Sequence, residues 1–506
     1  MREKELIKKS YITVLYYCGL ICMVVGVLPL LPLLALPFYP HEIIYAHWFL
    51  IPALSSILVG AIIFIATRNK ERISISLTHS AIIVVFLWLY GCFLGGVPFV
   101  FDPQFNYLHG LFESVSGWTT TGLTVVNTEK VPNLILLWRS IMQYIGGAGI
   151  AVVMLSILSG PSTSGIYQAE GHADEILPHV RKSAARVWKI YIAYLIFGIT
   201  AFIFVGMPIF DSVNHAMTAL ATGGFSVKEA SIGFYNSIPI EIVTIILMII
   251  GHISFATHHY IFRRNWKVVF RNCEIRSSTV ILLIFIPITI IFVTIPLFNP
   301  IKLNWSTNLV QYLSGMVVPI RKGVFEIVSA MTGTGFSVTD YSLWTSLGIF
   351  IIILMMCAGG HTGSTSGGIK QYRIYLITKS IIWAIQEQFL PPSAVVSRHA
   401  YKGENKIFVN PKHLRVLFDY LVLYLVTFLI GSAILMGCGF PIKESMFEFG
   451  SALGTVGLSM KITSISASPT VLITEIFGMF LGRLEFFVII YSLVKLFGDI
   501  KILRSK

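Results

Sequence analysis

The chain has few charged residues. Asp, Glu, Lys and Arg together make up 12% of its 506 residues, whereas hydrophobic residues make up 55%. A water-soluble domain of this composition would expose large apolar patches, which soluble proteins rarely do. The composition therefore excludes a soluble globular protein, and the mean hydropathy of +0.78 indicates a polytopic membrane protein.

Cysteine is also scarce, and the sequence contains none of the motifs typical of membrane-embedded hydrolases. The six cysteines are scattered, so we expect small hydrophobic residues rather than disulfides or metal ligands. They are Cys18, Cys22, Cys92, Cys273, Cys357 and Cys438. The histidines His252, His258 and His259 have no carboxylate among them, and neither His-Glu-x-x-His nor Gly-x-Ser-x-Gly occurs. We therefore expect neither an enzyme nor a bound organic cofactor.

Positive charge exceeds negative charge, with a formal net charge of +13. The basic residues cluster in short breaks between apolar runs, for example at 68–72 and 263–276. The interleaving of basic and aromatic residues that nucleic-acid-binding surfaces show is missing. We therefore expect a lipid membrane, and no nucleic acid, around this chain. The positive-inside rule assigns the basic breaks, and with them both termini, to the cytoplasm.

Two expected spans precede a plan that repeats four times. Tyr11–Leu36, bent by Pro29 and Pro32, crosses the membrane, and Trp48–Thr67 returns. Each repeat then has a spanning helix, a short helix, a glycine-bearing loop and an exit span. The expected short helices are Phe101–Trp118, Pro208–Leu220, Arg321–Met331 and Ile442–Leu453, and the exit spans are Leu134–Leu158, Ile238–Phe262, Leu343–Gln388 and Val471–Leu496.

The predicted fold is an all-α polytopic membrane protein with four pseudo-repeats around one central pore. It has ten complete spans and four short helices that enter the membrane and return. The expected units are an N-terminal two-helix extension at 1–75, then repeats at 76–175, 176–270, 271–395 and 396–506.

The four loops share a pattern in which small or hydroxylated residues end in a glycine that is followed by Leu or Phe. The glycines are Gly122, Gly224, Gly335 and Gly457. The short helices before them cannot cross a hydrocarbon layer of about 30 Å, so the chain must turn back at depth. Non-helical backbone at that depth is tolerated where it lines water or protein. The alternative is that the helices lie on the outer leaflet and the loops are ordinary turns.

Such loops suit a bare monovalent cation. A dehydrated potassium ion is coordinated by rings of carbonyl oxygens, and glycine gives the backbone freedom to present them. Hydroxyl oxygens are available from Thr119, Thr120, Thr121, Thr222, Thr332, Thr334 and Thr455. The loops contain no acidic ring, which argues against a divalent cation. We predict an ion pore whose selectivity filter is built from these four loops.

A second polar segment, Gly359–Gly368, interrupts the exit span of repeat 3. Its glycines and hydroxyl residues cannot sustain a helix, and because Lys370 does not directly follow the required glycine, a phosphate-binding loop is not favoured. We predict that this segment is a movable gate.

Arg483 lies well inside the last exit span, where an arginine normally faces a cavity or a partner. We expect it to face the permeation path and position the gate; the alternative is that it reaches a membrane interface.

Together these motifs resemble the Trk/Ktr/HKT superfamily of potassium transporters (TrkH/KtrB), and the two extra N-terminal spans resemble its TrkH branch. The resemblance covers Ser116–Gly122, Gln143–Gly149, Tyr167–Glu170, Gly367–Lys370 and Gly482–Glu485. It implies a filter at Thr119, Thr120, Thr121, Gly122, Ala221, Thr222, Gly223, Gly224, Thr332, Gly333, Thr334, Gly335, Gly454, Thr455, Val456 and Gly457. It implies a gate at Gly359, Gly360, His361, Thr362, Gly363, Ser364, Thr365, Ser366, Gly367 and Gly368, with Arg483 as its partner.

The resemblance also implies a biological setting. The transported ion would be potassium, and the chain would form a homodimer in a prokaryotic inner (plasma) membrane. The dimer would rest on a cytosolic, nucleotide-binding regulatory ring of the TrkA type, responsive to NAD, ATP or ADP. Two residues depart from the family pattern. His361 replaces a small residue or cysteine and predicts pH-sensitive gating, and Gly333 replaces threonine or alanine and removes one hydroxyl from the filter.

Two functions are compatible with this pattern. The first is channel-like potassium uptake through the filter and gate. The alternative is a cation-coupled secondary transporter, a sodium or proton symporter in which broken helices bind the coupling ion at the midplane. Such transporters usually have inverted halves, whereas the four copies here run in the same direction, which favours the pore.

Overall fold

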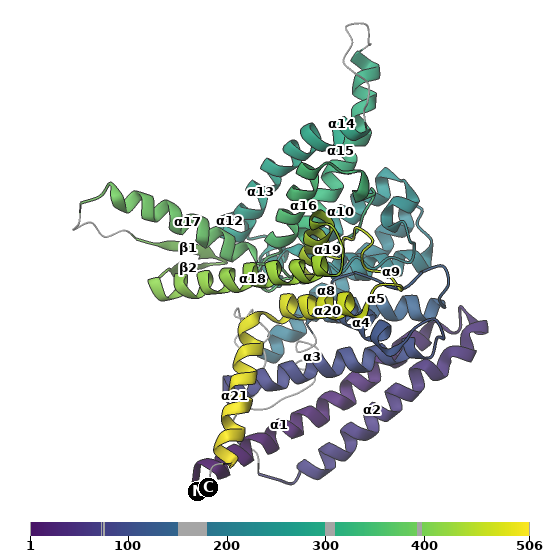
Figure 1. The fold of residues 1–506 in the computed structure, drawn as a ribbon, viewed down its shortest axis with the longest axis vertical. Helices are drawn as coiled ribbons and strands as arrows, with labels where there is room; N and C mark the ends of the chain where they lie inside the picture. Colours follow the sequence, from purple (N-terminus) through teal and green to yellow (C-terminus); the bar gives the residue numbers. More distant parts are fainter. Residues whose placement is uncertain are drawn as a thin grey trace.

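The computed structural model describes residues 2–71, 73, 76–149, 180–298, 309–391 and 397–504. Among these residues the chain is helical apart from one short hairpin of antiparallel strands, β1 (His399–Lys402) and β2 (Asn405–Phe408). Figure 1 shows this hairpin beside α17 (Gln371–Gln388) on an arm that projects from one end of the molecule.

The N-terminal extension is a pair of packed helices. α1 (Arg2–Val27) continues into a 3₁₀ segment, η1 (Leu28–Ala35), and after η2 (Pro40–Tyr45) α2 (Ala46–Thr67) returns along it. The prolines at which a bend was predicted, Pro29 and Pro32, lie in the 3₁₀ segment η1, where a missing backbone donor interrupts the α-helical hydrogen bonds.

The four repeats follow the predicted order. Repeat 1 contains α3 (Leu77–Val100), α4 (Tyr107–Trp118) and α5 (Asn133–Ala148). Repeat 2 contains α8 (Val180–Phe204), α9 (Ile209–Leu220), η3 (Ser231–Tyr235), α10 (Ile238–His252), α11 (Phe255–Phe262) and α12 (Trp266–Arg271). Repeat 3 contains α13 (Cys273–Thr289), the π-helical turn η4 (Ile290–Thr294), α14 (Ile295–Phe298), α15 (Leu309–Thr332), η5 (Tyr341–Leu343), α16 (Ser346–Ala358) and α17. Repeat 4 contains α18 (Pro411–Gly437), α19 (Ile442–Gly454), α20 (Pro469–Leu484) and α21 (Phe486–Arg504).

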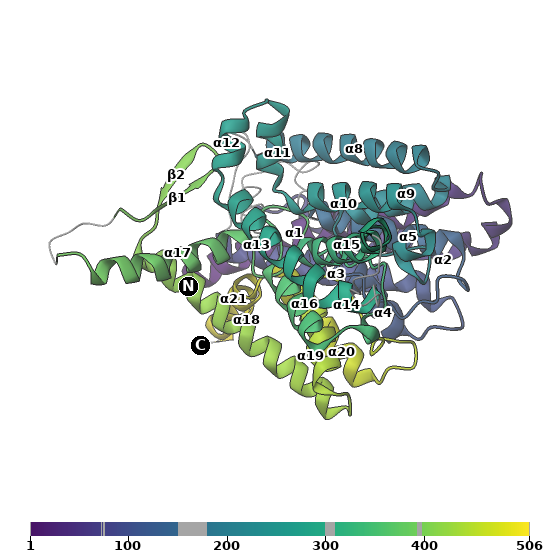
Figure 2. The same ribbon diagram turned by 90° about the horizontal axis from the view of Figure 1, so that it is seen from above.

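The short helices lie inside the molecule and the long helices surround them. Seen from above, α15 lies near the middle of the molecule, with α8 and α18 on opposite sides (Figure 2). The long helices keep an exposed apolar face: only 28% of the hydrophobic window of α8 and 17% of that of α13 is buried. Such faces fit a lipid environment.

Six helical stretches in the described part of the chain are long and apolar enough to span a membrane, and the bent pair α10–α11 would be a seventh. The other expected exit spans are interrupted. The break predicted after α16 is present, but the unbroken spans predicted at Ile238–Phe262 and Val471–Leu496 are wrong. α10 and α11 meet at 109°, and α20 ends at Leu484 before Glu485, whose φ is 61°. The far end of the predicted span Leu134–Leu158 lies outside the described residues.

The breaks have a common packing cause. The fourteenth residues of α5, α10 and α20 are Gly146, Gly251 and Gly482, and each backbone passes directly over the end of a short helix. A Cβ on these glycines would collide with the carbonyl oxygens of Trp118, Leu220 and Leu453, respectively. Contact this close between main chains admits glycine alone, and glycine also weakens the helix at that point.

The third short helix is longer than predicted. The third short helix was predicted at Arg321–Met331, but α15 begins at Leu309 and is 24 residues long.

Both chain ends lie at the same corner of the molecule (Figure 1), where the Tyr11 hydroxyl is 3.2 Å from Asp499 Oδ2. The two termini therefore lie at the same end of the molecule.

Candidate functional site

Four loops with one backbone conformation follow the C-terminal ends of α4, α9, α15 and α19. We name them glycine loops 1 to 4: Thr119–Gly122, Ala221–Gly224, Thr332–Gly335 and Gly454–Gly457. The second residue of every loop has a positive φ: 56° at Thr120, 49° at Thr222, 71° at Gly333 and 52° at Thr455. The fourth residue does too: 97° at Gly122, 70° at Gly224, 80° at Gly335 and 93° at Gly457. The four sequences thus form one repeated structure.

The hydrogen bonds of the loops repeat as well. The third residue of each loop donates its backbone N–H to the carbonyl oxygen of the residue five positions earlier, at 2.9 to 3.0 Å. The pairs are Thr121 with Ser116, Gly223 with Thr218, Thr334 with Ser329, and Val456 with Ser451. This bond turns the chain back over the end of the short helix. A left-handed conformation costs an ordinary residue about 1–2 kcal/mol, so Gly333, unlike the three threonines, meets this requirement without strain.

The four loops close into a ring. A Cβ on Gly122 would collide with the carbonyl oxygen of Gly223, and one on Gly224 would collide with that of Thr334. In the same way Gly335 faces the carbonyl oxygen of Val456, and Gly457 faces that of Thr121. Each loop therefore touches the next, and the fourth touches the first. The four loops therefore converge on one centre, as a fold of four repeats around one pore predicts.

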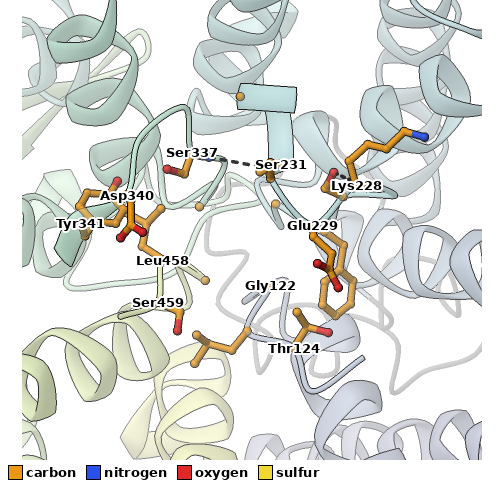
Figure 3. A pocket seen from close by; sticks show the side chains of 18 of the residues that line it. Gly122, Thr124, Lys228, Glu229, Ser231, Ser337, Asp340, Tyr341, Leu458 and Ser459 are labelled. Atoms are coloured by element: carbon orange, nitrogen blue, oxygen red, sulfur yellow. Dashed lines mark hydrogen bonds between the residues drawn. The ribbon is translucent and has the colours of Figure 1, made fainter. Parts of the chain in front are cut away.

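On one side of the ring lies a cavity of about 740 Å³ (Figure 3). Its lining comes from all four glycine loops and the segments that follow them, including Thr124, Ser231, Ser337 and Ser459. The backbone N–H of Ser337 donates to the hydroxyl of Ser231 at 3.3 Å and joins the segments after loops 2 and 3. The cavity has room for many water molecules and borders the ring through Gly122, Gly224, Gly335 and Gly457.

On the other side lies the segment predicted as a gate, Gly359–Gly368, which we call the interrupting loop. It follows α16, and Gly359, Gly363 and Gly368 have φ values of 66°, 74° and 77°. Its residue Thr365 contacts glycine loops 1 and 2: the carbonyl oxygen accepts from Thr120 Oγ1 at 3.4 Å, and Oγ1 lies 3.0 Å from Thr222 Oγ1. Oγ1 also lies 2.9 Å from the carbonyl oxygen of Gly251.

The next two residues of the interrupting loop contact glycine loops 3 and 4. A Cβ on Gly333 would stand 2.5 Å from Ser366 Oγ, and a Cβ on Gly367 would collide with Thr455 Oγ1. Ser366 Oγ and Thr455 Oγ1 are buried and have no hydrogen-bond partner in the described part of the chain. The interrupting loop therefore lies against the second residue of all four glycine loops.

Arg483 holds the interrupting loop in this place. Its guanidinium donates to the carbonyl oxygen of Thr365, and to those of Gly146 at 2.6 Å and Gly147 at 3.3 Å. It is thus bonded to the end of α5 and to the interrupting loop at once. Arg483 and the interrupting loop are therefore in direct contact. Glu485, two residues later, pairs instead with Arg373.

The far side of the interrupting loop is fixed by α13, α10 and α17. The Ser278 hydroxyl lies 2.9 Å from His361 Nε2 and 3.2 Å from His252 Nε2. Thr362 donates its N–H to Glu274 at 2.7 Å, and Gln371 donates its side-chain amide to the Gly359 carbonyl oxygen at 2.9 Å. Lys370 bonds the Ser366 carbonyl oxygen. His361 is therefore a buried anchor of the loop.

Four buried side chains that the sequence analysis missed hold the chain beyond the glycine loops. They stand nine positions before the four loop glycines and are Glu113, His215, Glu326 and Glu448. Glu113 accepts from the backbone N–H groups of Val125 and Val126 at 2.6 and 3.2 Å. His215 lies 2.9 Å from the Ser226 hydroxyl. The nine-residue spacing can be read from the sequence, but it is easily overlooked because repeat 2 has a histidine where the other three repeats have a glutamate.

Glu326 and Glu448 make corresponding bonds. Glu326 accepts from the N–H of Val338 at 2.7 Å, and Glu448 accepts from the N–H of Met460 at 2.8 Å. Each side chain thus anchors the segment leaving its loop to the short helix entering it. The short helices thus support the segments that leave the ring, and their C-terminal ends, which carry the negative end of the helix dipole, lead directly into the glycine loops.

The comparison with known families decides the class of protein. The TrkH family profile, described as cation transport protein, matches residues 48–501. The chain belongs to the TrkH family. It is therefore a multi-pass membrane transport protein and not an enzyme. Among the described residues of this TrkH-family protein, no cluster of His, Cys, Asp and Glu side chains is suited to hold a metal ion.

Individual relatives agree with the family. The chain is 29% identical over 490 residues to an uncharacterized cation transporter of Methanocaldococcus jannaschii, covering 95% of both proteins. It is 27% identical over 449 residues to the Trk system potassium uptake protein TrkH of Escherichia coli, covering 85% of this chain and 88% of that one. The crystal structure of the potassium transporter TrkH from Vibrio parahaemolyticus superposes with a TM-score of 0.79 at 23% identity, covering 95% of this chain and 98% of that one. The fold of this TrkH-family protein is thus the TrkH fold.

Proposed function

We propose that this chain is the channel-like translocating subunit of a potassium uptake system, with the glycine loops as its selectivity filter and the interrupting loop as its gate. The observation that carries the proposal is the closed ring of glycine loops, in which each loop glycine faces a carbonyl oxygen of the next loop. The names of the Escherichia coli and Vibrio relatives, which are potassium uptake proteins or transporters, support potassium as the ion.

The filter chemistry follows from the backbone. Left-handed and glycine conformations in alternation let successive carbonyl groups of one loop point to one side. Four such loops around one centre supply stacked rings of oxygens in place of water around an alkali ion. The hydroxyl of Thr455, which is buried and has no hydrogen-bond partner among the described residues, adds an oxygen at the level where the ring meets the interrupting loop. Neutral oxygens in these numbers favour a monovalent ion over a divalent one.

The gate proposal rests on the position of the interrupting loop. It lies directly against the second residues of all four glycine loops, so an ion leaving the ring meets the loop. Conduction therefore requires the loop to move, and the bonds from Arg483 and Thr365 resist that motion. The positive charge of Arg483 beside the loop adds an electrostatic barrier to a cation.

The proposed setting is a prokaryotic inner membrane with both termini in the cytoplasm, supported by the basic breaks and by the shared corner of the termini. We further propose a homodimer that rests on a TrkA-type regulatory ring binding NAD, ATP or ADP. Crosslinking of membranes in which the chain is co-expressed with such a ring protein would test the assembly.

The test of function is rubidium and potassium flux into proteoliposomes, with sodium as competitor. Gly335→Ser places a Cβ on the carbonyl oxygen of Val456, whereas Gly437→Ser meets no atom within 4 Å and is the matched control. We expect Gly335→Ser to reduce potassium flux at least tenfold or to lose discrimination against sodium, and Gly437→Ser to match the wild type. If Gly335→Ser changed neither flux nor selectivity, the filter assignment would be overturned, and flux that requires a sodium or proton gradient would replace the channel with a symporter.

A further inference from the structure

Two buried carboxyl groups share one hydroxyl behind glycine loop 4. Glu448 on α19 and Glu475 on α20 are both fully buried. The Oγ1 atom of Thr463 lies 2.6 Å from Glu448 Oε1 and 3.0 Å from Glu475 Oε2. Thr463 belongs to the segment that leaves glycine loop 4, so the shared hydroxyl lies next to the ring.

The hydrogen-bond count assigns a proton to this group. Glu448 accepts from the hydroxyl of Ser459 at 2.7 Å and from the backbone N–H groups of Met460 and Thr463 at 2.8 and 3.1 Å, as an ionised carboxylate does. The Thr463 hydroxyl has one proton, and its shorter contact is to Glu448. Its second contact is favourable when Glu475 is the donor, which requires a protonated Glu475.

At the position that corresponds to Glu475, repeat 1 has a basic residue instead of an acid. Arg139 is the seventh residue of α5 and Glu475 is the seventh residue of α20. In repeat 1, Arg139 Nε lies 3.1 Å from Glu113 Oε2 and balances its charge. In repeat 4 a second acid takes the place of that cation. Two anions at this separation in a buried site repel strongly, so one of them must be neutral.

The surroundings supply no compensating charge. Among the described residues, no lysine, arginine or histidine forms an ion pair with Glu448 or Glu475, and Glu475 Oε1 has no hydrogen-bond partner. The helices α4, α18, α19 and α21 pack against α20. The acid of α4, Glu113, is engaged by Arg139, and the titratable group that acts electrostatically on Glu475 is Glu448.

We infer that Glu475 is a proton-binding site, occupied at neutral pH, whose proton is donated to Thr463 while Thr463 donates to Glu448. Loss of this proton puts two carboxylates on one hydroxyl, and one of them must release Thr463. The segment behind glycine loop 4 then loses a bond that holds it to α19 or to α20. The protonation state of Glu475 thereby controls how many bonds hold the segment that follows glycine loop 4, one of the four loops of the ring.

Infrared spectroscopy of the purified full-length protein tests the site. The wild-type spectrum minus that of Glu475→Gln should contain one protonated-carboxyl C=O band at pH 7, and the band should disappear at alkaline pH. The control Glu404→Gln removes an exposed acid on the β1–β2 turn. It should leave the protonated-carboxyl C=O band unchanged at pH 7. A difference spectrum that shows only carboxylate bands at pH 7 would overturn the proposal. So would a band that potassium abolishes at constant pH, because the site would then bind the cation.

Flux gives a second readout, which rests on the proposed function. Glutamine keeps the size and neutrality of a protonated acid, so Glu475→Gln should retain neutral-pH rubidium flux within about twofold. Wild-type flux or sodium discrimination should change across the pH range in which the infrared band disappears, and Glu475→Gln should be flat there. The same pH response in Glu475→Gln would contradict control of the ring by this proton. The infrared result needs no transport, so it stands or fails separately from the proposed function.

Discussion

Arg483 donates a hydrogen bond to the carbonyl oxygen of Thr365, so a helix of repeat 4 holds the loop that interrupts repeat 3. The same guanidinium bonds the end of α5 in repeat 1 through Gly146. Three repeats are therefore joined beneath the ring by one side chain. A planar guanidinium suits this task, because its donors diverge in fixed directions to separate acceptors.

The first prediction concerns this side chain. Arg483→Gln removes the charge and its charge-assisted bonds, each worth about 1.5–3 kcal/mol, so the interrupting loop should leave the ring more often. We expect several-fold higher rubidium flux in proteoliposomes. Arg483→Lys keeps the charge but not the divergent donors, and should fall between the wild type and Arg483→Gln. Equal flux in all three proteins, each shown to be folded by gel filtration, would exclude a role in gating.

The second prediction concerns the hydroxyl of Thr365. Its Oγ1 lies within hydrogen-bond distance of Thr222 Oγ1 and of the carbonyl oxygens of Leu220 and Gly251. Thr365→Val preserves the shape but removes these bonds, at about 1 kcal/mol per bond. We expect higher flux with unchanged sodium discrimination.

A nearby residue provides the control for Thr365→Val. Thr362 lies in the same loop, where its backbone N–H donates to Glu274 at 2.7 Å, and its side chain makes no hydrogen bond within the described part of the chain. Thr362→Val should therefore leave flux unchanged. If both variants raised flux equally, the effect would come from loop hydrophobicity and not from the bonds of Thr365.

The repeated loops could be predicted from sequence because their conformation is local. A positive φ at the fourth residue selects glycine, and an apolar segment on each side reveals the membrane. The bends after His252 and Leu484 could not be predicted in this way. They depend on how closely Gly251 and Gly482 pass over carbonyl oxygens of other helices, and an isolated glycine in an apolar helix does not reveal such a contact.

The bracing side chains of the site escaped prediction for a different reason. A lone Glu in a short amphipathic helix is usually a solvated residue, and only the hydrogen bonds to the segment twelve or so residues later reveal Glu113 or Glu326 as an anchor. The interrupting loop was easier to find, because ten small or polar residues in succession break an otherwise apolar span. What sequence could not supply was their contact with the second residue of every glycine loop.

The third prediction is a pH dependence at the mouth of the cavity. Asp340 Oδ1 accepts from Ser342, and Oδ2 lies 2.9 Å from Lys461 Nζ, which links the segments after loops 3 and 4. Hydrogen bonds from the Ser342 backbone and then from Lys461 lower the pKa of Asp340 from 3.8 to about 2. A lowered pKa stabilises the folded state above the ordinary value, and that contribution is lost as the pH falls through about 2.

Thermal unfolding in detergent measures this contribution. Asp340→Asn should lower the melting temperature at pH 7 slightly, because an exposed ion pair contributes only about 0–1 kcal/mol. The difference from the wild type should shrink below pH 4 and vanish near pH 2. Glu229→Gln, which removes another acid from the cavity lining, serves as the control and should have little effect. A difference that persisted unchanged at pH 2 would show that the charge of Asp340 is not responsible.

The fourth prediction concerns the buried pair of repeat 1. Arg139 and Glu113 are 1% and 0% exposed, so Glu113→Gln leaves a guanidinium in the interior without its counter-charge. Removing one partner of such a pair costs about 3–5 kcal/mol. Replacing both, as in Glu113→Gln with Arg139→Met, removes the unbalanced charge and should recover much of the loss. Melting temperatures of the two single variants and the double variant measure the coupling. Because repeat 4 has an acid where repeat 1 has Arg139, Glu448→Gln should cost far less than Glu113→Gln, and equal losses in the two repeats would contradict the assigned charges.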